Sequence, residues 1–279
     1  MKKNFVHIIA FICFFASSLA ASAPSKKASL VVDMHDGKVL YSSMANELRY
    51  PASLVKMMTL YIAFKKVNNG ELPLDKKLSI SAKAAAMPRL NIALKAGGSI
   101  TVRKAILGLI VHSANDAAVV LAEGIAGSET KFVAMMNEQA KKLGMKDSIY
   151  YNSSGWIHKK QKTTAHDQAK LAIALKRDFP QFFPWFSVTS FNFNGKTYKS
   201  HNRVLHNYKG ATGLKTGFIN DSGFNIATTA HKNGKHLVGV VMGGNTAKER
   251  DKLVMALLDD GFAKVGKQKP AKKSTNKAK

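Results

Sequence analysis

Short apolar runs that flank turn residues predict β-strands at both ends of this chain. Residues 28–34 and 38–41 are two such runs, and an Asp-Gly pair at 36–37 joins them in the manner of a β-hairpin. Residues 224–230 and 236–242 form a second, longer pair around a Lys-Asn-Gly turn. We therefore expect the globular part of the chain to begin with one hairpin and to end near another.

Between these two hairpins, apolar residues recur at the spacing of an amphipathic helix. Most of these segments start at a residue that can cap a helix, and several stop at a glycine. The predicted helices are residues 51–64, 101–110, 117–125, 128–143 and 164–175, with a closing helix at 246–262 and shorter strand candidates at 197–198 and 213–216. This order predicts an α/β (α+β) fold, in which an antiparallel sheet built from both ends of the chain lies beside an inserted helical subdomain.

The first residues have the three-part pattern of a secretory signal peptide. A basic start at Lys2 and Lys3 precedes an apolar run over residues 5–15, and small residues follow up to Ala23. An uncleaved membrane anchor is the alternative, but the apolar run is shorter than the roughly 20 residues that a bilayer-spanning helix needs. We therefore expect residues 1–23 to be a leader and the protein to be exported, to the periplasm or the extracytoplasmic face of the cell envelope.

The composition adds two constraints. The formal net charge of +26 favours anionic partners such as wall polymers or anionic lipid, while export argues against nucleic acid. The single cysteine, Cys13, lies in the expected leader, which excludes disulfides and thiol chemistry from the exported part. Residues 266–279 are rich in lysine and poor in apolar residues, so we expect a disordered tail that contacts an anionic membrane or wall weakly, by charge. Residues 24–265 remain as one globular domain.

Three short strings known from enzymes with a serine nucleophile occur in order along this domain. They are Ser53-Leu54-Val55-Lys56, Ser113-Ala114-Asn115 and Lys215-Thr216-Gly217. Ser-x-x-Lys also occurs at 128–131 and 274–277, and Ser-x-Asn occurs at three other places, whereas Lys-Thr-Gly occurs once. The first two patterns therefore carry little information alone, and their context must decide.

Context distinguishes the three Ser-x-x-Lys segments. Ser128 has the features of an ordinary helix N-cap, with an acidic residue in the first turn, and Ser274 lies in the expected tail. Ser53 follows Pro51 at the start of an apolar helix, where its side chain can face a cleft and its backbone N–H stays free of helical bonding. Lys56 is three positions further on and therefore lies on the same helix face. A plain N-cap at Ser53 remains the structural alternative.

The chemistry expected of this pair is acyl transfer. A serine hydroxyl needs a base to become nucleophilic, and Lys56 can serve only when its amine is neutral. An ordinary lysine, with a pKa of about 10.4, is almost fully charged near neutral pH. Burial and a neighbouring cation both lower that pKa, and Lys215 would supply the cation if its strand runs alongside.

The remaining motif residues fit the other steps of acyl transfer. Ser113 could pass a proton to the leaving amine, and Asn115 could hold the substrate amide. The backbone N–H groups of Ser53 and Phe218 could bind the oxyanion. Lys215 and Thr216 would then face the terminal carboxylate of the substrate.

Histidines give weaker signals. His112 adjoins the second motif, but a packed or surface histidine is the more common case. His158, His166 and Asp167 could suggest a metal site, yet Thr164 and Asp167 have the spacing of a capping pair at a helix start. We therefore expect no metal and no other cofactor.

The chain resembles the D-alanyl-D-alanine carboxypeptidase family, the low-molecular-mass penicillin-binding proteins, over residues 28–265. The resemblance extends well beyond the three motifs. The matching segments are Pro51–Thr59, Ser113–Ala118, Asn152–Gly155, Thr163–Asp167, Gly213–Phe218, Ser222–Asn225 and Val241–Gly244.

This resemblance implies a β-lactamase/transpeptidase-like, penicillin-recognising fold and a specific reaction. It implies that Ser53 is acylated by a peptidoglycan stem peptide ending in D-Ala-D-Ala, that terminal D-Ala leaves, and that water completes the hydrolysis. It also implies that β-lactam antibiotics acylate Ser53. By position, Arg203 and Arg250 resemble residues that help to bind the terminal carboxylate, together with the Lys215–Phe218 stretch.

Three other functions remain open. A β-lactamase that deacylates through a glutamate is disfavoured, because no glutamate occurs between Glu138 and Glu249, and we expect slow release of penicillin. A D,D-endopeptidase that cuts peptide crosslinks would carry the same motifs. A cationic, non-enzymatic wall-binding protein would suit the charge but would leave the three motifs without an explanation.

Overall fold

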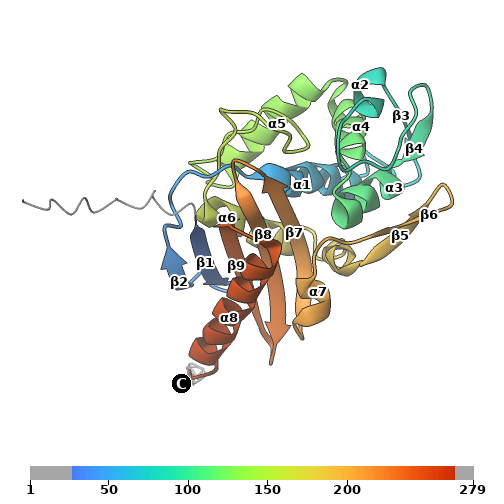
Figure 1. Ribbon diagram of the computed structural model, residues 1–279. Coiled ribbons are helices and arrows are strands. Elements are labelled where there is room, and N and C mark those ends of the chain that lie inside the picture. Colours follow the sequence, from blue (N-terminus) through green and yellow to red (C-terminus); the bar gives the residue numbers. More distant parts are fainter. Residues whose placement is uncertain (1–26, 268–279) are drawn as a thin grey trace, which may run out of the picture.

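An antiparallel sheet brings together the two ends of the described chain. The computed structural model describes residues 27–267, and its largest sheet has five strands in the order β2-β1-β9-β8-β7. The strands are β1 (Ala28–Asp33), β2 (Val39–Ser43), β7 (Ala211–Ile219), β8 (Gly223–Lys232) and β9 (Lys235–Gly244). The two predicted hairpins are β1–β2 and β8–β9, and β1 pairs with β9 (Figure 1). This confirms a sheet built from both ends of the chain.

The chain between β2 and β7 forms a lobe of helices beside this sheet (Figure 1). The helices of this stretch are α1 (Val55–Asn68), α2 (Ala82–Ala85), α3 (Val102–Leu107), α4 (Asn115–Ala126), α5 (Glu129–Lys142), α6 (Ala165–Asp178) and α7 (Val204–Asn207). Two small ladders pair β3 (Lys77–Ser79) with β4 (Ser99–Thr101) and β5 (Ser190–Phe193) with β6 (Lys196–Lys199). Helices α1 and α7 contact β7, the edge strand of the sheet, whereas α6 packs across β1, β8 and β9.

Helices on both faces bury the sheet. The C-terminal helix α8 (Ala247–Gly266) packs against β8 and β9 on one face, and α6 packs on the other (Figure 1). Along β9, Leu237 and Val241 join the cluster under α8, whereas Val238, Val240 and Met242 join the main core. Because successive strand residues point to opposite faces, a strand covered on both sides is apolar nearly throughout, as the predicted run 236–242 is after His236.

Helix boundaries depart from the predicted ones where the backbone leaves regular α geometry. The segment predicted at 51–64 begins as a 3₁₀ turn, η1 (Ala52–Leu54), and continues as α1. The segment predicted at 101–110 divides into α3, capped by Thr101 as expected, and a π-helical turn, η2 (Gly108–His112). Ser113 follows with a φ of 62°, a left-handed conformation that ends this turn before α4. A second 3₁₀ turn, η3 (Phe183–Ser187), precedes β5.

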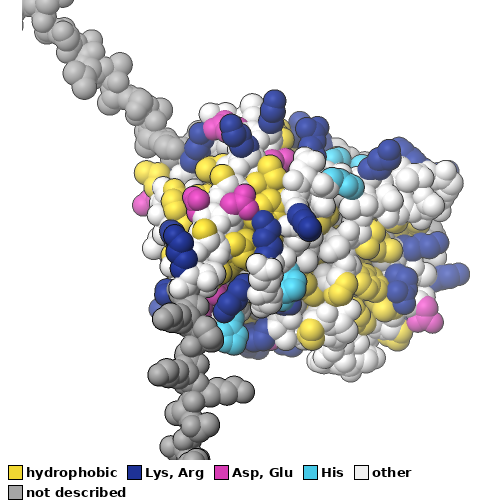
Figure 2. All heavy atoms as spheres, turned by 90° about the horizontal axis from the view of Figure 1, so that it is seen from below, with side chains coloured by type: hydrophobic (Ala, Val, Ile, Leu, Met, Phe, Trp, Pro, Cys, Tyr) yellow, Lys and Arg dark blue, Asp and Glu magenta, His cyan; other side chains and the backbone are white. Residues whose placement is uncertain are grey.

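Lysine and arginine side chains are scattered over the molecular surface (Figure 2). Figure 2 shows them spread over one face with few acidic groups between them. No helix within residues 27–267 combines the length and the apolar character needed to cross a membrane. The expected leader at 1–23 and residues 268–279 of the expected tail lie outside the described residues.

Candidate active site

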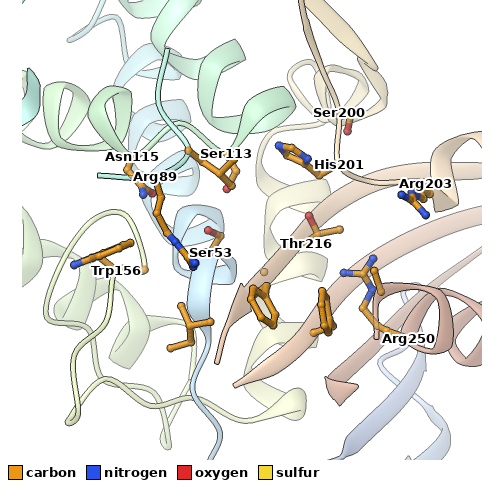
Figure 3. Close-up of a pocket in the computed structure, with 17 residues that line it drawn as sticks. Ser53, Arg89, Ser113, Asn115, Trp156, Ser200, His201, Arg203, Thr216 and Arg250 are labelled. Atoms are coloured by element: carbon orange, nitrogen blue, oxygen red, sulfur yellow. The ribbon is translucent and has the colours of Figure 1, made fainter. Parts of the chain in front are cut away.

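A pocket of about 690 Å³ opens between the edge strand β7 and the helical lobe (Figure 3). Eight of the residues singled out from the sequence line it: Ser53, Ser113, Asn115, Arg203, Thr216, Gly217, Phe218 and Arg250. The other two, Lys56 and Lys215, are buried, with 0% and 3% of their surface exposed. The described lining includes no aspartate or glutamate. The structure therefore brings all ten residues to one strongly cationic pocket.

The sheet fixes the segment that carries Ser53. The Asn225 side chain, on β8, donates to the carbonyls of Tyr50 (2.9 Å) and Pro51 (3.2 Å). Its Oδ1 accepts from the Gly243 N–H at 2.9 Å. A buried amide that satisfies three backbone groups holds the chain rigidly, so Ser53 enters the pocket at a fixed position on η1.

Two glycines allow neighbouring backbone to approach Ser53 closely. A Cβ at Gly217 would lie 3.0 Å from the Ser53 nitrogen, and a Cβ at Gly155 would lie 2.0 Å from the Ala52 carbonyl oxygen. Gly155 also has a φ of +80°, which side chains with a Cβ rarely adopt. Both glycines occur in the segments by which the sequence resembles the family. A Cβ at Gly155 would overlap the backbone of Ala52, and a Cβ at Gly217 would crowd the backbone of Ser53.

Lys56 lies directly beneath Ser53 on α1. Its Nζ is 3.1 Å from Ser53 Oγ and 2.7 Å from Asn115 Oδ1, and it also donates to the Ser154 carbonyl. The amide and carbonyl oxygens can only accept hydrogen bonds, whereas the hydroxyl can donate or accept. A neutral amine that donates to these two oxygens therefore directs its lone pair toward the Ser53 hydroxyl.

Burial and like charge lower the pKa values of both lysines. The pKa of Lys56 lies well below its ordinary value, first because burial removes its charge from water and second because Lys215 is a nearby cation. Asp116 opposes this shift. Burial, together with the charge of Arg250, lowers the pKa of Lys215 to about 7. The expectation that Lys215 would lie close enough to influence Lys56 is met.

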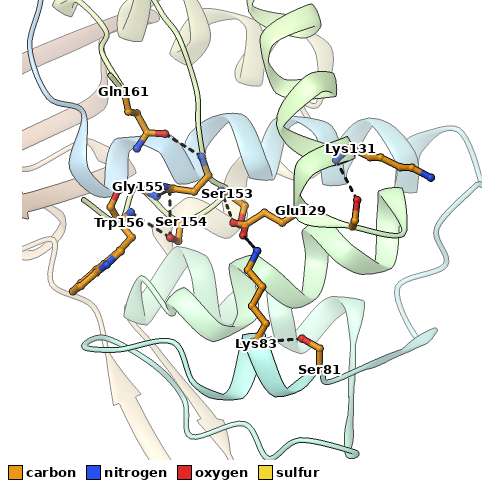
Figure 4. Close-up of polar contacts among 12 residues, drawn as sticks. Ser81, Lys83, Glu129, Lys131, Ser153, Ser154, Gly155, Trp156 and Gln161 are labelled. Carbon is orange, nitrogen blue, oxygen red and sulfur yellow. Dashed lines mark hydrogen bonds and ion pairs between the residues drawn. The ribbon is translucent and has the colours of Figure 1, made fainter. Parts of the chain in front are cut away.

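A polar network supports the Ser154 carbonyl (Figure 4). One oxygen of Glu129, Oε1, accepts from the Ser153 N–H at 2.9 Å and from Ser153 Oγ at 2.7 Å, and the other pairs with Lys83 at 2.5 Å. Burial alone would raise the pKa of Glu129, but these partners outweigh it and hold the pKa below the ordinary value. Thr59 on α1 donates to the Ser153 carbonyl at 2.6 Å. The loop is thereby tied to both α5 and α1.

Ser113 and Asn115 approach the pocket from the junction of η2 and α4. Ser113 is 2% exposed, and its Oγ, which faces the pocket with Ser53, has no hydrogen-bond partner among the described residues (Figure 3). The Asn115 side chain links Lys56 to Pro88. Its Oδ1 accepts from Lys56, and its Nδ2 donates to the Pro88 carbonyl at 3.0 Å. One amide hydrogen of Asn115 remains for a ligand.

The two predicted arginines lie at the end of the pocket beyond Thr216 (Figure 3). Arg250 is 4% exposed and is held by Asp251 Oδ1, at 2.6 and 2.9 Å, and by the Asn225 carbonyl, at 3.1 Å. Arg203 is exposed and near enough for its charge to lower the pKa of Arg250. These arginines make this end of the pocket suitable for a carboxylate.

The histidines considered from the sequence, and Asp167, lie outside the pocket lining. Asp167 accepts from the backbone N–H of Asp147 and from Ser148 Oγ, both at 2.9 Å, and its own N–H is capped by Thr164 at 3.1 Å. His158 stacks on the ring of Tyr151, with centroids 4.1 Å apart. His112 packs edge-on against Tyr198 outside the pocket lining, and burial lowers its pKa to about 4.

Several residues that line the pocket were not singled out from the sequence, among them Arg89, Trp156 and His201. Arg89 lies in a stretch with no regular secondary structure, and Trp156 follows directly on the Asn152–Gly155 segment. Trp156 is set by local bonds, since its N–H donates to Ser154 Oγ at 3.2 Å and its carbonyl accepts from Asn152 Nδ2 at 2.9 Å. Its place next to a matched segment was the one available signal.

Comparisons with known proteins find related peptidases. The peptidase S11 family model, described as D-alanyl-D-alanine carboxypeptidase, matches residues 16–246. D-alanyl-D-alanine carboxypeptidase DacF of Bacillus subtilis is 31% identical over 252 residues, which cover 86% of this chain and 63% of that protein. A D-alanyl-D-alanine endopeptidase of Pseudomonas aeruginosa is 30% identical over 244 residues, which cover 80% of this chain and 77% of that protein.

The fold agrees as well. The solved structure of penicillin-binding protein D2 from Listeria monocytogenes, in its cefotaxime-bound form, aligns with a TM-score of 0.73 at 30% identity and covers 84% of this chain and 96% of that chain. This confirms the expected penicillin-recognising fold. The chain spans 61% to 68% of the length of seven curated carboxypeptidases that it matches. From its motifs, its fold and these relatives, we conclude that the chain belongs to the D-alanyl-D-alanine carboxypeptidase family.

Proposed function

We propose that this protein is a serine-type D-Ala-D-Ala carboxypeptidase that removes the terminal D-alanine from peptidoglycan stem peptides. The observation that carries the proposal is the fully buried Lys56 amine, 3.1 Å from Ser53 Oγ and with a strongly lowered pKa. A structural lysine would be exposed or paired with an acid. A buried amine with a lowered pKa beside a serine hydroxyl is instead the arrangement that activates a nucleophile.

In this mechanism, Lys56 acts as the general base. Ser53 Oγ attacks the carbonyl carbon of the penultimate D-alanine while its proton moves to Lys56 Nζ. The backbone N–H groups of Ser53 and Phe218 stabilise the oxyanion. Ser113 relays a proton to the leaving nitrogen, the C–N bond breaks, and free D-alanine departs. Water then hydrolyses the Ser53 ester and restores the hydroxyl.

The substrate is held at both sides of the bond that is cut. Thr216, Arg203, Arg250 and the Lys215 charge receive the terminal carboxylate, and Asn115 holds the amide of the acyl part with its free Nδ2 hydrogen. The absence of acidic residues from the described lining supports an anionic ligand, because nothing there would repel it.

We propose that β-lactams acylate the same serine and that the resulting acyl-enzyme is hydrolysed slowly. No glutamate or aspartate among the described lining residues is available to activate a deacylating water. We also propose that the protein works outside the cytoplasm, as its leader-like start suggests, and that its lysine-rich tail adds a weak, salt-sensitive contact with anionic wall or membrane.

The decisive experiment combines D-alanine release with mass spectrometry after penicillin treatment. The purified protein should release D-alanine from a peptide that ends in D-Ala-D-Ala and should carry one acyl adduct on Ser53. A protein that releases no D-alanine and takes up no penicillin would instead be a cationic wall binder.

Endopeptidase activity is the second candidate, favoured by the name of the relative from Pseudomonas aeruginosa. Both activities use the same acyl-enzyme and differ in the leaving group, which is free D-alanine in one case and a crosslinked peptide in the other. Digestion of purified muropeptides separates them. Monomers released from crosslinked dimers faster than D-alanine from pentapeptides would favour the endopeptidase.

A further inference from the structure

The pocket has a second cationic group on the other side of the nucleophile. Arg203 and Arg250 lie at the end beyond Thr216, whereas Arg89 and Trp156 lie on the opposite side of Ser53 (Figure 3). In Figure 3 the Arg89 side chain extends into the pocket toward Ser53. The mechanism above gives Arg89 no role, because the terminal carboxylate is already received at the far end.

The backbone at Arg89 is fixed on both sides by Asn115. The Pro88 carbonyl accepts from Asn115 Nδ2 at 3.0 Å, and the Leu90 carbonyl accepts from the Asn115 N–H at 2.7 Å. Arg89 itself has a φ of 61°, in the left-handed region. A residue other than glycine stays in that region only when its surroundings hold it there. The residue that holds it, Asn115, also binds Lys56, so Arg89 has a fixed position relative to the nucleophile.

The guanidinium of Arg89 has no polar partner in the part of the chain that the structure describes. No hydrogen bond or ion pair joins it to any other residue between 27 and 267. Its neighbours in the lining include the aromatic side chain of Trp156 and no acid. An arginine that is fixed at its backbone and unpaired at its head group is available to form a charge-assisted, bidentate hydrogen bond with a ligand carboxylate.

We propose that Arg89 forms a second carboxylate subsite, which selects substrates with an acidic group on the residue that precedes D-Ala-D-Ala. This inference rests on the proposed function. Ser53 attacks between the two D-alanines, so the leaving residue extends toward Arg250 and the acyl part extends toward the opposite side. A carboxylate on the side chain of the preceding residue then reaches Arg89, with its apolar stem along Trp156.

The test uses two peptides that both end in D-Ala-D-Ala and differ in one group. The preceding residue ends its side chain in a carboxylate in one peptide and in the uncharged carboxamide in the other. We expect the wild-type protein to prefer the carboxylate about tenfold in kcat/KM, as a charge-assisted bond at a partly exposed site can give. In Arg89→Gln the preference should fall below about twofold, and Arg89→Lys should retain part of it.

A matched control separates the subsite from general electrostatic attraction. Arg103→Gln removes the same charge from the same lobe, outside the pocket lining, and should keep the full preference. A second pair of ligands, two penicillins that differ by one carboxylate on the acylamino side chain, should show the same change in the ratio of acylation rates. Melting temperatures confirm that each variant is folded.

The outcomes distinguish this inference from the proposed function. Release of D-alanine from both peptides with no preference in wild type, or with the full preference retained in Arg89→Gln, overturns the subsite but leaves the carboxypeptidase. An equal loss in Arg103→Gln also overturns it, because long-range attraction then explains the preference. If the wild-type protein shows neither D-alanine release nor acylation, both proposals are overturned.

Discussion

Two Ser-x-x-Lys segments of this protein share a pattern but differ in everything around it. Ser128 caps α5 in the ordinary way, since its Oγ accepts from the Lys131 N–H at 3.2 Å, and the Lys131 side chain is exposed. Ser53 caps nothing with its side chain, and Lys56 is completely buried with three oxygen partners. The comparison shows that the reactivity expected of a Ser-x-x-Lys motif depends on whether distant parts of the chain bury its lysine.

The enclosure follows from where each helix lies. The first ten residues of α1, Val55–Phe64, are all buried, because α1 packs against α4, α5 and α6 and also contacts β7. On α5, the buried residues form one face and the lysines point outward. A lysine three residues after a serine is therefore dehydrated on α1 and remains in water on α5.

The largest expected effect separates the two serines. Ser53→Ala should abolish labelling by a fluorescent penicillin and lower D-alanine release at least about 10³-fold, because the acyl ester cannot form. Ser128→Ala should label like wild type and lose only about 1 kcal/mol of stability with its cap. Labelling that survives in Ser53→Ala, measured on a gel after denaturation, would contradict the assignment.

The next effect separates the two lysines. Lys56→Met keeps most of the buried volume but removes the base, so the acylation rate should fall about 10²- to 10⁴-fold. Lys131→Met, at an exposed position, should change neither the rate nor, by more than about 0.5 kcal/mol, the stability. Stopped-flow acylation with a chromogenic β-lactam measures both. A Lys56→Met protein that is folded and acylates normally would remove Lys56 from the mechanism.

A third prediction concerns pH. Lys56 must be neutral to accept a proton, so kcat/KM should first rise with pH as Lys56 loses its proton at its lowered pKa. Lys215, with a pKa of about 7, must be charged to receive a carboxylate, so kcat/KM should fall above that pH. Arg250→Gln removes the cation that helps to lower the pKa of Lys215, and the falling limb should move to higher pH.

The position of this limb, rather than the absolute rate, tests the idea, since Arg250 also contacts the proposed ligand. Lys131→Met provides the control and should leave the whole profile unchanged. A profile that stays flat from about pH 7 to pH 10 would show that the charge of Lys215 is not required.

The sequence predicted the parts of this protein that have a periodic or residue-type signal. The hairpins, the main helices and the family fold are confirmed, and the ten candidate site residues meet at one pocket, although their roles remain predictions. Strands β3, β4 and β5 were not predicted, because three or four residues give no reliable period.

Two features of the site had no sequence signal at all. The Ser154 partner of Lys56 is a backbone carbonyl, which every residue possesses, so no residue type reveals it. The orientation of Arg89 depends on a positive φ that is imposed by Asn115, 26 positions along the chain. Both depend on tertiary contacts between segments that are distant in sequence.

The smallest of the expected effects on activity links the two Ser-x-x-Lys segments to each other. The residue after Ser128, Glu129, holds Ser153, and the next carbonyl, that of Ser154, accepts from Lys56. The segment that begins at Ser128, which has no proposed catalytic role, thus helps to position the segment that contains Ser53 and Lys56. Glu129→Ala should lower the acylation rate about tenfold, because the loop beside Lys56 loses its anchor, and should cost about 1–3 kcal/mol for the unpaired Ser153 groups.

Glu129→Gln tells positioning apart from charge. A single oxygen, Oε1, accepts both hydrogen bonds from Ser153, and a glutamine oxygen can replace it, whereas the ion pair with Lys83 would be lost. Acylation near the wild-type rate in Glu129→Gln, together with the loss in Glu129→Ala, would support positioning through hydrogen bonds. If both variants are equally slow at equal thermal stability, the negative charge itself matters, and the link between the two segments is electrostatic rather than geometric.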